Sequence, residues 1–71
     1  MPVWTWRYED AEGRAVEPAA TPPERGFPTQ ADAETWVGEN WRALLAGGAE
    51  QVHLLADGER AYGPMSLRPA E

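Results

Sequence analysis

The first stretch of the chain alternates between large aromatic residues and smaller or polar ones. Residues 3–8 place Trp4, Trp6 and Tyr8 on one face of an extended chain, because successive side chains of a strand point to opposite sides. The intervening residues lie on the other face. A period of two is typical of a β-strand, and we expect one here.

A turn and a short return strand are expected next. Residues 9–14 include Gly13, and glycine adopts at little cost the positive φ that such a turn requires. The return strand covers roughly residues 14–17 and stops there, because Pro18 cannot donate a ladder hydrogen bond. Residues 1–17 are therefore predicted to form a β-hairpin.

Proline dominates the segment that follows. Residues 18–28 hold four of the seven prolines and show no hydrophobic period, which predicts an extended crossover rather than a helix or a strand. Phe27 is the large apolar residue of this segment. It directly precedes the expected helix, where such a side chain often packs back on the first turn.

A helical period begins after Thr29, which is a good N-cap residue. Asp32 and Glu34 suit the positive end of the helix dipole, and Gly47-Gly48 supplies a C-terminal cap. Residues 29–47 are therefore predicted to form one helix. Its apolar face collects Ala33, Trp36, Val37, Trp41, Leu44 and Leu45.

Two residues fit this helix poorly. Asn40 falls within the apolar face, where it either bonds to the backbone of the crossover or marks a hydrated edge of that face. We expect the first. Gly38 costs about 1 kcal/mol relative to alanine inside a helix. A close approach of another chain segment to Gly38 would explain its presence.

A second hairpin is predicted over residues 50–67. Asp57-Gly58 is a strong signal for a two-residue type I′ turn, and Gly63-Pro64 must bend the final strand or form a bulge in it. Residues 68–71 are expected to be a frayed tail. The turn predicts the pairs Ala56–Glu59, Leu54–Ala61 and Val52–Gly63 on one face, and His53–Tyr62 and Leu55–Arg60 on the other.

These elements predict an α+β fold of the order ββαββ. Two hairpins form a four-stranded antiparallel sheet, and one helix packs on one face of it. The 71 residues form a single small domain. The strand order stays open, since the first strand can neighbour either the third or the fourth.

Charge and composition narrow the classes of function. The net charge is −6, and all six basic residues are arginines. A chain with this negative charge repels nucleic-acid phosphates and anionic membranes. We therefore expect neither of them as a partner. The sequence contains no cysteine, one histidine and no long apolar run, which predicts a cytoplasmic protein without a metal or other cofactor.

Catalytic chemistry has little support in the sequence. His53 is a lone histidine in a predicted strand, and a general base needs both reach to a substrate and an orienting partner. The glycines form no phosphate-binding loop, and the carboxylates lack calcium-loop spacing. We therefore predict that the protein is not an enzyme.

The aromatic residues leave two interpretations open. Four tryptophans in 71 residues can build a compact core, or part of them can leave an apolar sheet face for a protein partner. If the outer face binds a partner, its candidate interface residues are His53, Leu55, Arg60 and Tyr62.

Two classes of function follow from the second interpretation. The first is a small non-enzymatic interaction or regulatory protein, with a protein partner or a second copy on that face; a two-fold dimer is the simplest cover for it. The alternative is a module that binds a small molecule or peptide with tryptophan and arginine side chains at one end of the sheet.

Three segments also carry a family resemblance. They are the TWRYED sequence of residues 5–10, the QADAETW sequence of residues 30–36 continuing to Trp41-Arg42, and the YGPMSL sequence of residues 62–67. Together they resemble a group of short uncharacterised actinobacterial proteins. The resemblance implies a stand-alone cytoplasmic domain and, because the group has no known activity, assigns no functional residue.

Overall fold

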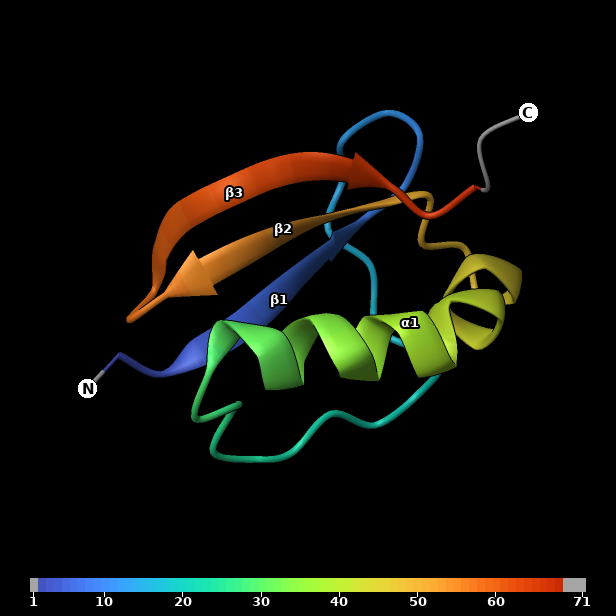
Figure 1. Ribbon diagram of the computed structural model, residues 1–71. Coiled ribbons are helices and arrows are strands. Elements are labelled where there is room, and N and C mark those ends of the chain that lie inside the picture. The colour runs from blue at the N-terminus through green and yellow to red at the C-terminus, as the bar shows by residue number, and fades with distance from the viewer. Residues whose placement is uncertain (1, 69–71) are drawn as a thin grey trace.

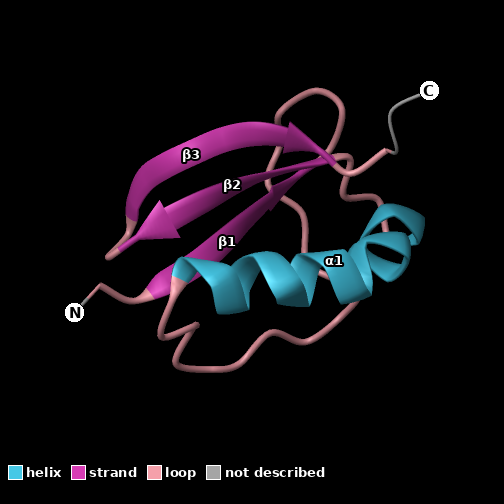
Figure 2. Cartoon of the chain, in the orientation of Figure 1, coloured by secondary structure: helices cyan, strands magenta, loops and turns pink. Residues whose placement is uncertain are grey.

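The computed structural model describes residues 2–68 and contains one helix and three strands (Figure 1). In chain order these are β1 (Trp4–Glu9), α1 (Gln30–Ala46), β2 (Gln51–Ala56) and β3 (Glu59–Ser66). The strands form one antiparallel sheet in the order β1-β2-β3. α1 lies along one face of this sheet, as the cartoon in Figure 2 shows. The α+β class is confirmed.

The predicted strand over residues 14–17 is wrong, so the described residues have the order βαββ rather than ββαββ. One isolated bridge, between Glu9 and Ala15, remains of the first hairpin. Residues 14–17 could bury little on the sheet, since only Val16 among them is even half-buried. The opposite edge of β1 pairs along its whole length with β2, whose Val52 and Leu54 are buried in the core.

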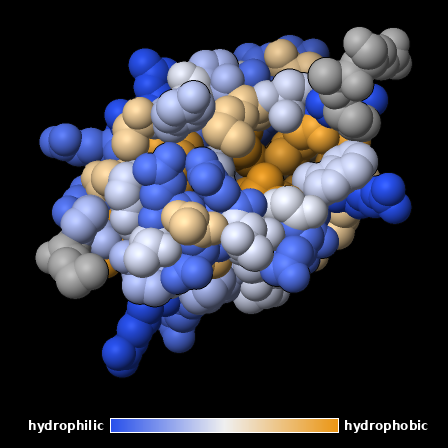
Figure 3. All heavy atoms as spheres, in the orientation of Figure 1, coloured by the Kyte–Doolittle hydropathy of each residue, from blue (hydrophilic) through white to orange (hydrophobic). Residues whose placement is uncertain are grey.

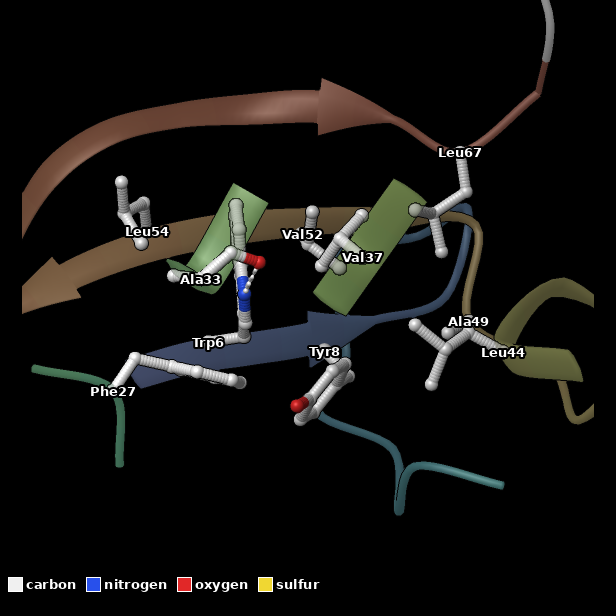
Figure 4. Packing of buried hydrophobic residues seen from close by; sticks show 10 residues of the cluster. All are labelled: Trp6, Tyr8, Phe27, Ala33, Val37, Leu44, Ala49, Val52, Leu54 and Leu67. Carbon is white, nitrogen blue, oxygen red and sulfur yellow. Dashed lines mark hydrogen bonds between the residues drawn. The ribbon is translucent and has the colours of Figure 1, made fainter. Parts of the chain in front are cut away.

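The pairing of β1 with β2 settles the strand order and places the core. Trp6 lies opposite Leu54 and Tyr8 opposite Val52, and all four side chains are buried under α1. The indole Nε1 of Trp6 donates a hydrogen bond of 3.0 Å to the Ala33 carbonyl of α1 (Figure 4). This bond ties the helix to β1.

The proline-rich crossover lies along the outer edge of β1. Phe27 exchanges two backbone hydrogen bonds with Trp4, of 2.9 and 2.7 Å. Its ring is buried 5.7 Å from the ring of Trp36, so it packs against α1 as expected. Thr29 then caps the helix, because its Oγ1 accepts a bond of 3.1 Å from the Asp32 amide.

The apolar face of α1 is confirmed, but the reasons expected for its two poorly fitting residues are wrong. Ala33, Val37 and Leu44 are buried. Asn40 donates to the Trp36 carbonyl of its own helix, at 2.8 Å, rather than to the crossover. Among residues 2–68, no atom of another segment lies within 4 Å of a Cβ built on Gly38, so none of them approaches it closely.

The second hairpin forms around the expected turn, with positive φ at Asp57 and Gly58. Its register is confirmed only beside the turn, where Ala56 pairs with Glu59 and Leu55 with Arg60. Two shifts follow, and each adds one residue to β3. After the first shift Leu54 pairs with Tyr62, and after the second Val52 pairs with Met65. The predicted pairs Leu54–Ala61, His53–Tyr62 and Val52–Gly63 are therefore wrong.

The extra residues bend β3, as the Gly63-Pro64 pair predicted. The strand curves away from α1 (Figure 1), and apolar residues are visible in the hollow between them in Figure 3. Arg68 is tied back by a bond of 2.6 Å to Glu50, and residues 69–71 of the predicted tail lie outside the described residues. Within residues 2–68 no helix has the length and apolarity needed to cross a membrane.

Gly38 provides the first test. We expect Gly38→Ala to stabilise the fold by about 1 kcal/mol, because the added methyl group meets open space on the exposed side of α1. Thermal unfolding followed by circular dichroism should show a rise of about 4–8 °C in Tm.

Gly26→Ala is the matched control. Gly26 has a φ of +78°, and its added Cβ would lie 2.8 Å from the Trp4 carbonyl oxygen. The same methyl group should therefore lower Tm there. An unchanged or lower Tm for Gly38→Ala would show that the helix needs the glycine.

Candidate functional site

The face of the sheet opposite α1, called here the outer face, is polar. Side chains alternate along a strand, and Trp6 and Tyr8 face the helix, so their neighbours on β1 point outward. Residues in register with them on β2 and β3 share that face. The outer face includes Thr5, Arg7, Glu9, Gln51, His53, Leu55, Arg60 and Ser66.

A buried carboxylate organises this face. Arg7 Nε donates to Oε2 of Glu9 at 2.6 Å, and His53 Nε2 lies 2.8 Å from Oε1. Gln51 Nε2 donates to the same Oε1 at 3.1 Å. β1 supplies Arg7 and Glu9 from alternate positions, and β2 supplies the other two from the facing positions. Glu9 is only 7% exposed, so water contributes little to its solvation.

The charge of Glu9 depends on these donors. The hydrogen bonds from Arg7 and then from His53 hold the pKa of the Glu9 carboxyl below its usual value of 4.5, although burial acts in the opposite direction. Since a carboxylate only accepts, His53 carries a proton on Nε2. Its Nδ1 is buried without a hydrogen-bond partner in the described residues.

β3 covers the other side of His53. A Cβ built on Gly63, whose φ is +123°, would lie 3.1 Å from Nδ1 and 3.0 Å from the Cα atom of His53. Only a residue without a side chain fits so close to the ring. The bend at Gly63 thus encloses His53 between two strands.

A solvent-open depression of about 410 Å³ lies over the network. It is lined by Arg7, Glu9, His53, Leu55, Gly58 and Arg60. Three of the four predicted interface residues are thus brought together. The fourth, Tyr62, does not line the depression, because the register shift pairs it with Leu54 on the helix side of the sheet. Its side chain is exposed, at 61%.

The sequence analysis missed Arg7 and Glu9. Arg7 and Glu9 are two residues apart, so the sequence placed both on one face of the strand. Only the pairing of β1 with β2 shows that His53 lies next to them on that face. The arrangement offers charged N–H groups of two arginines on either side of an apolar side chain, Leu55. Within residues 2–68 no group of three or more His, Cys, Asp or Glu residues could hold a metal ion.

Comparison of the chain with protein-family models, with curated proteins and with solved structures finds no match. The resemblance to short actinobacterial proteins therefore stays an expectation.

The lowered pKa of Glu9 predicts how acid acts on the fold. A carboxyl group whose pKa is lower in the folded chain than in the unfolded one stabilises the fold fully above its usual pKa, here 4.5. That contribution is lost as the pH falls through the lower folded pKa. Glu9→Gln should therefore be less stable than the parent at neutral pH, and the difference should shrink in this acid range.

Urea unfolding at a series of pH values measures the difference. Glu12→Gln, which removes an exposed carboxylate from the turn after β1, is the matched control and should show no such convergence. Parallel pH profiles of the parent and Glu9→Gln would contradict the assigned network.

Proposed function

We propose that this protein is a small, cytoplasmic, non-enzymatic interaction or regulatory protein whose partner binds the outer face of the sheet. The observation that carries the proposal is the shared depression. His53, Leu55 and Arg60 line it together with Arg7, on the face that α1 leaves uncovered. Charged groups at its rim and an apolar side chain within it are features of protein recognition surfaces.

The surroundings of His53 support a non-enzymatic role. A general base needs a free nitrogen within reach of a substrate. One nitrogen of His53 is bonded to Glu9, and the other is buried beside Gly63. Both nitrogens are thus occupied or shielded within the fold, which suits a structural part in the outer face.

The two edges of the sheet favour the outer face as the docking surface. The segment between β1 and α1 pairs with both ends of β1, through Phe27 of the crossover and through Ala15 before it. β3 carries two register shifts and Pro64, which has no N–H group to donate. These features obstruct the addition of a long partner strand at either edge.

The charges define the partner's chemistry. Arg7 uses its Nε for Glu9, and the remaining N–H groups of a guanidinium can donate outward. Arg60 lies opposite Leu55 on β3. A protein that presents a carboxylate beside an apolar side chain fits this surface, whereas the net charge of −6 disfavours nucleic acid.

A second candidate function is the binding of a small acidic molecule. The volume of about 410 Å³ supports it, because it lies within the usual range of ligand sites. None of the four tryptophans lines the depression, so the arginines rather than the tryptophans would carry this recognition.

Charge reversal on the outer face tests the leading proposal. The tagged chain, Arg60→Glu and Leu55→Asp should be compared as baits in lysate of the source organism. We expect a stoichiometric partner on the parent chain and at least about tenfold less on each variant, as for residues at the centre of an interface. Circular dichroism checks that the variants fold.

Arg14→Glu is the matched control, because Arg14 is exposed in the turn beyond β1. It should retain the partner. Equal recovery on all baits would contradict docking at the outer face. Light scattering of the purified chain separates a homodimer from a different partner: a dimer on this face should tighten with added salt, which screens the repulsion between two acidic copies, and Leu55→Asp should split it.

A further inference from the structure

A second hollow lies between the outer edge of β1 and the crossover. Its volume is about 270 Å³, and its walls include Trp6, Tyr8, Pro22, Pro23, Glu24 and Phe27. It is distinct from the depression on the outer face. The hollow thus lies between β1 and the crossover, and its walls are mainly aromatic and proline side chains.

The backbone of β1 points toward the crossover at alternate residues. In an antiparallel pair, the N–H and C=O groups of every second residue face away from the partner strand. Val3 and Glu9 accept hydrogen bonds from residues at the two ends of β2, at Asp57 and Glu50. The groups of Trp4, Trp6 and Tyr8 therefore face outward, and those of Trp4 bond to Phe27.

The crossover leaves a gap at the middle of this edge. The Tyr8 carbonyl accepts a bond of 2.9 Å from Val16, and Trp4 is paired with Phe27. Between these contacts, the N–H and C=O groups of Trp6 and the N–H group of Tyr8 make no backbone bond to the crossover within residues 2–68. Trp6 lies in the wall of the hollow, so its outward-facing backbone groups lie at this gap.

The crossover cannot close the gap itself. Prolines have no N–H group, and residues 18, 22 and 23 are prolines. The chain also folds back on itself just before Phe27, where the Gly26 amide donates to the Pro23 carbonyl at 3.0 Å. The gap is thus a consequence of the crossover's composition.

We propose that this gap binds a short extended peptide, or another ligand with the same N-acyl amino acid unit. One residue of the ligand pairs with Trp6 as Phe27 pairs with Trp4. Its N–H group donates to the Trp6 carbonyl, and its carbonyl accepts from the Trp6 amide. Its side chain is apolar, because proline and aromatic side chains form the walls, and the volume limits it to about one residue with its flanking amides.

NMR titration of the ¹⁵N-labelled full chain tests the proposal. The probe is N-acetyl-leucine N-methylamide. We expect the amide signals of Trp6 and Tyr8 to shift saturably, while those of Arg7 and Glu9, which face β2, move less. N-acetylglycine N-methylamide, which lacks the side chain, should bind more weakly.

A methylated probe isolates the hydrogen bond. N-acetyl-N-methylleucine N-methylamide cannot donate to the Trp6 carbonyl, so it should bind about three- to tenfold more weakly. Equal affinity for both leucine probes would overturn the proposal. So would a titration in which the signals of Trp6 and Tyr8 do not shift or do not saturate, which would mean that water alone satisfies these groups.

Two variants test whether the probe binds in this hollow and through neutral groups. Glu24→Gln should bind the neutral probe as the parent does, and loss of binding there would indicate a site for cations instead. Arg60→Glu should also bind it normally, because Arg60 lines the outer-face depression and not this hollow. The result is therefore independent of the function proposed for the outer face.

Discussion

The pairing of β1 with β2 is the contact on which the rest of the structure depends. The two strands are far apart in sequence, so their pairing must offset the loss of chain entropy in the long segment between them. It does so by placing Trp6 beside Leu54 and Tyr8 beside Val52, all buried. The same pairing brings Glu9 to His53 on the opposite face. The core and the polar network thus form together.

The polar network around Glu9 adds a second penalty, besides the loss of core packing, to any change of register between β1 and β2. A shift of one residue between β1 and β2 would exchange the two faces of one strand. Glu9 would then lose its β2 donors Gln51 and His53 and keep only Arg7, which lies on its own strand. A buried carboxylate without partners is far more costly than one with several. We infer that the network contributes more to the choice of register than to net stability.

Features set by neighbouring residues were predictable from the sequence. The Thr29 cap, the apolar face of α1 and the Asp57-Gly58 turn each follow from a few adjacent positions, and all are present. Pairing between distant segments was not predictable in this way. Residues 14–17 follow a turn signal and lie beside the edge of β1 that faces away from β2, but only one bridge forms there, whereas β2 pairs with β1 along its whole length.

The residues of the candidate site show the same difference between local and distant information. Leu55 and Arg60 were found because the turn fixes the register as far as the first shift in β3. Tyr62 lies beyond that shift, and the Gly63-Pro64 signal indicated a bulge without giving its position. Arg7 and Glu9 could be added only once the strand order was known. Proximity across the sheet was thus the missing information, rather than the chemistry of the residues.

The two proposed sites use different parts of the chain and should respond differently to salt. Recognition on the outer face relies on the charged groups of Arg7 and Arg60, at the rim of an open depression, where ions screen such interactions. Recognition at the β1 edge relies on neutral backbone groups of Trp6 between proline and aromatic walls. An acidic partner held by these arginines should therefore bind more weakly as ionic strength rises, while the pairing with Trp6 persists.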